Sequence, residues 1–162
     1  ISAHVTRMGR RHIKLATDVA LSGAFGIDLA LDKATDEERA QIAAAVKLYK
    51  ERIRPLVMRG ELYRLSSPYE HPLASLSYVS ADKSEAVVYL YQVADGRVPR
   101  ICMEGLDASR QYVVKEVNLS PGTDSRFALH DKSVTGAELM EKGIENSLSA
   151  RFESAVLILT SK

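Results

Sequence analysis

The sequence has no tryptophan and a single cysteine, Cys102, among its 162 residues. One cysteine excludes a disulfide within the chain. Because Cys102 stands between Ile101 and Met103 in a strand-like pattern, we expect a buried, inert thiol. Tryptophan offers the largest aromatic face for stacking on a sugar, so its absence removes the commonest mark of a sugar-binding surface.

The chain also lacks an excess of charge of one sign and a long apolar run. Its 22 Lys and Arg residues nearly balance 21 Asp and Glu residues, for a net charge of +1. This balance gives no electrostatic case for binding nucleic acid or an anionic membrane. No apolar run approaches the roughly 18 residues of a membrane-spanning helix. The chain starts at Ile1, without an initiator methionine or a signal segment, as expected of a piece of a longer protein.

Familiar catalytic and cofactor motifs are missing as well. The four histidines lack metal-ligand spacing such as H-E-x-x-H, and no serine lies in a G-x-S-x-G motif. Gly23-x-x-Gly26 lacks the lysine of a phosphate-binding loop, so we interpret it as a turn. We therefore expect no metal, no cofactor and no catalytic residue in this chain. Surface or turn positions are expected for most of the aspartates, namely Asp18, Asp32, Asp82, Asp107 and Asp131.

The first part of the chain has the hydrophobic spacing of helices. Residues 13–24 and 35–54 repeat apolar side chains every three to four positions. Thr35 and Glu38 have the spacing of a capping box at the start of the second helix. Pro55 disfavours helical geometry in the preceding residue, so we expect it to end or kink this helix.

The segment between these helices, residues 24–31, is short and almost continuously apolar. Its sequence AFGIDLAL predicts a strand buried on both faces, as in a parallel sheet. Asp28 interrupts this strand, and a buried carboxylate needs a partner. His4 stands beside the end of another expected strand. Asp28 and His4 are therefore the candidates for a binding role in this part of the chain.

From residue 61 onward, the hydrophobic period changes to two. Residues 85–93, EAVVYLYQV, form the strongest strand pattern, dense in β-branched and aromatic residues. Six to eight strands separated by turn residues predict an antiparallel β-sandwich. Tyr89 and Tyr91 fall on one face of that strand, where they are either core residues or a platform for a sugar. The fold class is therefore α+β, with a strand–helix part up to about residue 58 and an all-β part over 59–162.

A set of short segments occurs in a fixed order along the chain. They are His4-Val5-Thr6, Asp18-Val19-Ala20, Phe25-Gly26-Ile27-Asp28-Leu29, Lys50-Glu51 with Arg54-Pro55, Tyr63-Arg64-Leu65, Glu104-Gly105-Leu106-Asp107 and Gly136-Ala137-Glu138-Leu139-Met140. Together they resemble the C-terminal portion of α-galactosidases of glycoside hydrolase family 36, the melibiase type. The chain departs from the family pattern over residues 8–12, so the resemblance implies no substrate contact for that loop.

The resemblance implies a map of the chain and a function for its parent. Residues 1–58 would be the last strand–helix elements of a (β/α)8 catalytic barrel, a remnant with two helices, and 59–162 the β-sandwich that follows it. The parent would be a retaining α-galactosidase whose catalytic aspartates lie upstream, so the isolated chain would be inactive. Its partners would be the rest of the barrel, α-galactosides and further copies in a homo-oligomer. The alternative is a stand-alone module that binds carbohydrate through Tyr89 and Tyr91, or that drives oligomerisation.

Two strand–helix units cannot close a barrel, so the expected parallel strands would have open edges. We therefore expect residues 1–34 to be poorly packed, to fold against the sandwich, or to be buried in a contact between copies.

Overall fold

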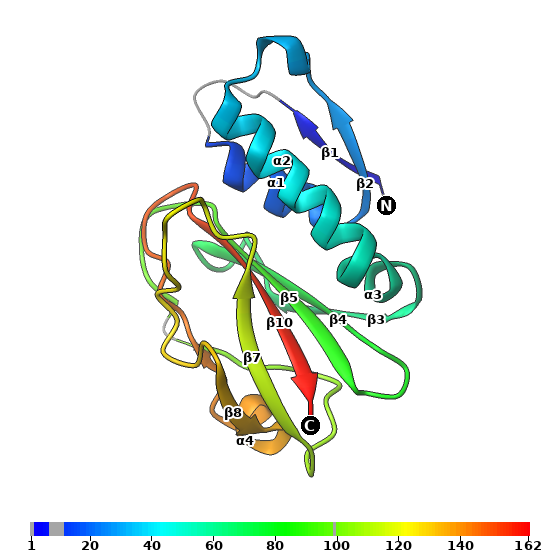
Figure 1. Ribbon diagram of the computed structural model, residues 1–162. Coiled ribbons are helices and arrows are strands. Elements are labelled where there is room, and N and C mark those ends of the chain that lie inside the picture. The colour runs from blue at the N-terminus through cyan, green and yellow to red at the C-terminus, as the bar shows by residue number, and fades with distance from the viewer. Residues whose placement is uncertain (1, 7–11, 99) are drawn as a thin grey trace.

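The computed structural model describes residues 2–6, 12–98 and 100–162, which form a helical layer and a large β-sheet (Figure 1). The first part contains β1 (Ser2–Thr6), α1 (Ile13–Leu21), β2 (Ala24–Asp28), a 3-10 turn (Leu31–Lys33), α2 (Asp36–Leu48), a π-helical turn (Tyr49–Ile53) and α3 (Arg54–Arg59). The second part contains β3 (Glu61–Ser66), β4 (Leu73–Val79), β5 (Glu85–Gln92), β6 (Arg100–Ile101), β7 (Gln111–Val117), β8 (Lys132–Thr135), α4 (Gly136–Glu141), β9 (Ile144–Glu145) and β10 (Ser154–Ser161). None of the helices in these described ranges is long and apolar enough to cross a membrane.

β1 and β2 pair in parallel and are connected through α1. Val5 of β1 is buried in a small core with Ala20 of α1 and Ile42 of α2. The expectation that β2 is buried on both faces is wrong, since Ile27 is 40% exposed and Asp28 is exposed. The reason is that the helical core packs around Val5, on the face of the pair opposite to Asp28.

The second helix begins as expected and ends later than expected. The Thr35 hydroxyl accepts a hydrogen bond from the Glu38 amide at 3.1 Å, and the Glu38 carboxylate accepts one from the Thr35 amide at 3.0 Å. The predicted capping box is therefore confirmed. Of the two outcomes expected at Pro55, an end or a kink, the end is wrong, because the helix continues as α3 to Arg59 after the π-helical turn. The π-helical turn before Pro55 shifts the hydrogen-bond register, so that proline enters the first turn of α3, where its missing N–H is tolerated.

The described strands of the second part form a six-stranded antiparallel sheet in the order β3-β4-β5-β10-β7-β8. β10, the last strand of the chain, lies between β5 and β7. The change of period near residue 60 thus marks the change from helices to this sheet. The two central strands carry the most continuous apolar sequences, because both of their faces are covered.

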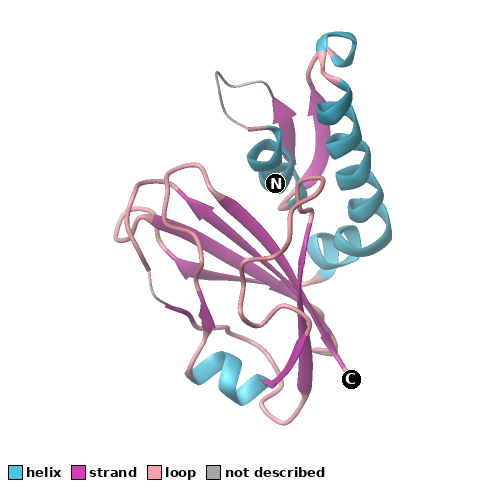
Figure 2. Ribbon diagram, turned by 60° about the vertical axis from the view of Figure 1, so that its left-hand side comes forward, coloured by secondary structure: helices cyan, strands magenta, loops and turns pink. Residues whose placement is uncertain are grey.

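The helices cover one face of the sheet, and a smaller layer covers the other (Figure 2). On the helical side, Leu21, Ile53 and Leu56 pack against Val87 and Val156. On the other side, the core residues contributed by the smaller layer are Ile101, Met103, Leu106, Leu139, Ile144 and Leu148. That layer contains α4 and the two-stranded β6–β9 sheet. The expected sandwich is therefore confirmed in the coarser sense of an antiparallel, sheet-rich fold with few helices.

Cys102 corrects a further expectation. Its side chain is exposed, whereas both neighbours in sequence, Ile101 and Met103, are buried. β6 ends at Ile101, and the alternation of inward and outward side chains leaves the thiol on the outside.

Candidate functional site

Three tyrosines of the sheet hold the C-terminal end of α1. They come from neighbouring strands, Tyr78 from β4 and Tyr89 and Tyr91 from β5. Their hydroxyls donate to backbone carbonyls of α1 and its cap, Tyr91 to Asp18 at 3.0 Å, Tyr89 to Leu21 at 2.8 Å and Tyr78 to Ser22 at 3.1 Å. Carbonyls in the last turn of a helix have no partner within the helix, so these bonds satisfy groups that would otherwise be orphaned. The tyrosines thus attach α1 to the sheet.

This role decides how Tyr89 and Tyr91 are interpreted. The Tyr89 side chain is 0% exposed, and a ring without exposed surface cannot stack on a sugar. Burial, followed by the neighbouring Tyr91, raises the pKa of Tyr89 well above 10, so its hydroxyl remains a hydrogen-bond donor. Tyr91 is half-buried, and its ring stacks on that of Tyr89 with the centroids 6.3 Å apart. Of the two interpretations of this strand face, a core or a sugar platform, these contacts with the helix favour the core.

Asp18 lies at the centre of a polar network between α1 and the sheet. Its side chain is 0% exposed, so the expectation of a surface aspartate is wrong. The carboxylate forms an ion pair with Lys14 at 2.6 Å and accepts hydrogen bonds from Asn118 at 2.6 Å and Ser154 at 2.7 Å. Burial raises the pKa of Asp18 above its usual value, and the charge of Lys14 opposes that shift. The network supplies the partners that a buried carboxyl requires.

Asn118 links this network to the second helix. It follows β7 with a φ of +55°, a conformation in which asparagine is enriched among non-glycine residues. Its amide nitrogen donates to Asp18 and also to the Thr17 hydroxyl at 3.0 Å. Its amide oxygen accepts from Gln41 of α2 at 2.9 Å. One side chain therefore connects α1, α2 and the end of β7.

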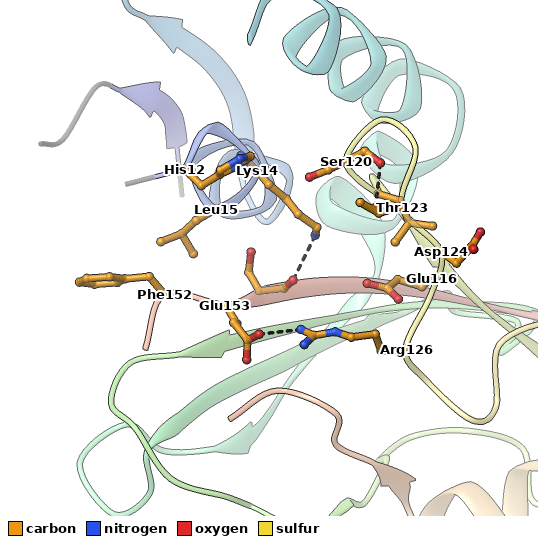
Figure 3. Close-up of a pocket in the computed structure, with 12 residues that line it drawn as sticks. His12, Lys14, Leu15, Glu116, Ser120, Thr123, Asp124, Arg126, Phe152 and Glu153 are labelled. Carbon is orange, nitrogen blue, oxygen red and sulfur yellow. Dashed lines mark hydrogen bonds and ion pairs between the residues drawn. The ribbon is translucent and has the colours of Figure 1, made fainter. Parts of the chain in front are cut away.

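A pocket of about 370 Å³ lies beside this network (Figure 3). It is bounded by the first turn of α1, the loop after β7 and the start of β10. Lys14 extends from the helix into the pocket, and Arg126 and Glu153 lie opposite it (Figure 3). Because these segments are far apart in the sequence, the pocket exists only in the folded chain.

An ion pair forms one side of the pocket. The Arg126 guanidinium donates to Glu153 at 2.8 Å. The other carboxylate oxygen of Glu153 accepts from the backbone amides of Ser149 at 2.8 Å and Ala150 at 2.9 Å. Burial opposes ionisation of Glu153, but these hydrogen bonds and the charge of Arg126 outweigh it and lower the pKa. Glu153 is therefore held as a carboxylate with a fixed position.

The other two candidates, His4 and Asp28, lie on the β1–β2 pair. His4 pairs with Gly26 and Asp28 with Thr6 in the parallel register. Since side chains alternate along a strand, His4 and Asp28 share the face opposite to buried Val5, and both are exposed. Asp28 stands at the carboxyl end of β2. Across residues 2–6, 12–98 and 100–162, no three His, Cys, Asp or Glu side chains are placed to hold a metal ion.

Comparison with known proteins identifies the family. The family model of the glycosyl hydrolase family 36 C-terminal domain matches residues 73–159. The chain belongs to this family. A curated relative, α-galactosidase AgaA of Geobacillus stearothermophilus, is 34% identical over 137 residues, which cover 79% of this chain and 19% of AgaA.

Solved structures extend the likeness of this family 36 chain to the helical part. The crystal structure of α-galactosidase AgaB from Geobacillus stearothermophilus has a TM-score of 0.81 and 33% identity, and the match covers 99% of this chain and 22% of that one. A variant of AgaA in complex with raffinose has a TM-score of 0.83 and 29% identity over the same shares of the two chains. The family 36 chain thus spans about a fifth of the length of the relatives it matches.

The residues that join the two parts of this family 36 chain were not found from its sequence. Asp18 gives one local indication, since Lys14 precedes it by four positions, the spacing of a helical ion pair. Asn118 follows a predicted strand, where a turn is the ordinary interpretation. The altered loop of the family pattern lies mostly within residues 7–11, outside the described residues.

Proposed function

We propose that this chain is the C-terminal region of a retaining α-galactosidase. In this proposal residues 1–58 supply the last two strand–helix units of a (β/α)8 barrel, and residues 59–162 form the β domain that follows it. The parent enzyme hydrolyses terminal α-galactosides by double displacement between two carboxylates. Those carboxylates come from barrel segments outside this chain, which has no catalytic residue of its own.

One observation carries the proposal, namely the solvent-exposed face of the parallel β1–β2 pair. Parallel strands normally have both faces covered. Here α1 and α2 cover the face that bears Val5, while the face that bears His4 and Asp28 is open. A barrel wall has this arrangement locally, with helices outside and the second face directed into the barrel. The exposed face is therefore where the missing strands and the barrel interior would lie.

The position of Asp28 adds a role for this face. Barrel enzymes bind their substrates at the carboxyl ends of the strands, and Asp28 and Thr6 stand at those ends of β2 and β1. We assign Asp28 to the wall on the substrate side and His4 to the barrel interior below it. The tyrosine contacts and the network around Asp18 then fix the last helices of the barrel to the β domain. The AgaA variant solved with raffinose supports an α-galactoside as the substrate class.

A chimera tests the proposal. The C-terminal fifth of AgaA from Geobacillus stearothermophilus is replaced by this chain, and hydrolysis of an aryl α-galactoside is measured for the chimera and for the isolated chain. We expect turnover by the chimera and none by the chain alone. A second chimera that also carries Tyr89→Phe tests the role of the junction. It should have a lower melting temperature than the first chimera and still hydrolyse the substrate.

Either of two results would contradict the proposal. Turnover by the isolated chain would place the catalytic pair inside these residues. A folded, soluble chimera without turnover would show that this chain does not complete the barrel of an α-galactosidase.

A further inference from the structure

The pocket beside Asp18 has the features of a built site. Glu116 on β7 lines it with only 6% of its surface exposed, and the Ser125 hydroxyl donates to one of its carboxylate oxygens at 2.5 Å. Lys14 is also fixed, since its ammonium donates to Asp18 at 2.6 Å and to the Ser154 carbonyl at 3.1 Å. Charged side chains held in this way keep their positions before a ligand arrives, which reduces the cost of binding.

The balance of charges in the pocket favours a neutral ligand. Besides His12, its lining contains two basic side chains, Lys14 and Arg126, and three carboxylates, Glu116, Asp124 and Glu153. An anion would face this excess of negative charge, and each cation already has a carboxylate partner. Vicinal hydroxyl groups suit such a lining, because they donate to carboxylates and accept from ammonium and guanidinium groups.

Apolar groups complete the lining. Leu15 from α1 and Phe152 before β10 border the pocket (Figure 3). Phe152 has a φ of +73°, which a bulky side chain rarely adopts, and the residue is 39% exposed. The Arg151 guanidinium lies 4.6 Å from the centre of its ring. Strained residues of this kind concentrate at functional sites. The C–H face of a pyranose ring is apolar and its edge carries hydroxyls, so it matches both parts of the lining.

We propose that this pocket binds one neutral pyranose unit of a saccharide. Its volume of about 370 Å³ lies in the lower part of the range for small-molecule sites. In the proposed mode, Arg126, Glu116 and Glu153 bind the hydroxyls, and Phe152 contacts the apolar face of the ring. The inference goes beyond the proposed hydrolytic function, because the described residues of this chain form the pocket and its occupancy requires no catalytic group.

A titration tests the inference. The ¹⁵N-labelled 162-residue chain is titrated with methyl α-galactopyranoside and, separately, with methyl α-glucopyranoside, and amide chemical shifts are followed. We expect saturable shifts confined to residues 12–15, 116–126 and 152–154. Phe152→Gly and Arg126→Gln should each weaken binding about tenfold. Tyr69→Ala, which removes a 97% exposed aromatic ring from the β3–β4 loop, is the matched control and should not change the affinity.

The variants also separate binding from folding. Glycine tolerates a positive φ, so Phe152→Gly should unfold at or above the temperature of the parent chain while it loses the ligand. Absence of saturable shifts with both glycosides would overturn the inference, as would equal weakening by Tyr69→Ala. Sodium sulfate at matched ionic strength is the last comparison, and saturation of the same amides by sulfate but not by sugar would identify an anion site instead. No step of this titration measures hydrolysis. The chain can therefore fail to bind the glycosides while the chimera is active, or bind them while the chimera is inactive, so the two proposals are tested separately.

Discussion

Replacing Asn118 with alanine should strongly destabilise the junction between the helices and the sheet. The substitution removes a hydrogen bond to Asp18, whose carboxyl is paired with Lys14, and two neutral hydrogen bonds, with Thr17 and Gln41. A hydrogen bond to a charged group contributes about 2 kcal/mol and a neutral one about 1 kcal/mol. The expected loss is therefore about 4 kcal/mol of unfolding free energy.

The backbone conformation of Asn118 adds a second, separable contribution. Alanine at a φ of +55° costs about 1 kcal/mol more than a residue suited to that region. Asn118→Gly loses the same hydrogen bonds without this strain, so it should be about 1 kcal/mol more stable than Asn118→Ala. The pair of variants thus separates the contribution of the side-chain hydrogen bonds to the unfolding free energy from the contribution of the backbone conformation.

Urea unfolding followed by far-ultraviolet circular dichroism measures these differences. For a chain of this size, 1 kcal/mol corresponds to about 2–4 °C in the melting temperature, so a total loss of about 5 kcal/mol in Asn118→Ala should lower it by about 10–20 °C. Asp124→Ala, an exposed substitution in the same loop region, is the control and should change the stability by less than about 0.5 kcal/mol. A loss no larger than this control for Asn118→Ala would refute the reasoning.

Three further predictions concern other parts of the fold. Hydrogen bonds, led by that from the Ser80 hydroxyl, lower the pKa of Asp82 to about 2. A carboxyl whose pKa falls on folding stabilises the native state above its unfolded pKa and loses that contribution as the pH drops through the folded value. The melting temperature of the parent chain should therefore exceed that of Asp82→Asn by the largest amount at pH 5, and this difference should shrink toward pH 2. Tyr89→Phe leaves a buried carbonyl of α1 without its partner and should cost about 1–3 kcal/mol in urea unfolding, whereas Tyr69→Phe at the exposed loop should have no effect. Cys102 should react with a thiol reagent in the folded chain at a rate close to that in urea, because its side chain is exposed.

Each of these predictions has a contradicting result. A pH-independent difference for Asp82→Asn would mean that the turn does not hold the carboxylate in solution. Equal stability of Tyr89→Phe and the parent chain would show that the hydroxyl bond to α1 makes no net contribution. A thiol that reacts only after unfolding would restore the original expectation of a buried cysteine.

Patterns within a few residues could be interpreted from the sequence alone. The capping box at Thr35 and the apolar stripe of α2 depend on spacings of three and four residues, and the structure has both. The density of β-branched and aromatic residues in β5 likewise predicted a strand. Pro55 shows where local rules fall short, because a π-helical turn accommodates it without ending the helix. The predictions that Cys102 and the strand around Asp28 are buried failed for another reason, since burial depends on which face of a strand the neighbouring layers cover.

Local residue patterns predicted most of the helices and strands, and the ordered motifs indicated the family to which the chain belongs. The tertiary structure alone decided which polar residues matter, since Asp18 meets Asn118 and Ser154 across 100 and 136 positions. It also placed β10 between β5 and β7 and brought Lys14 and Arg126 to one pocket. The physical reason is that hydrophobic period and turn chemistry act over a few residues. Burial and hydrogen bonding instead depend on which distant segments the fold brings into contact.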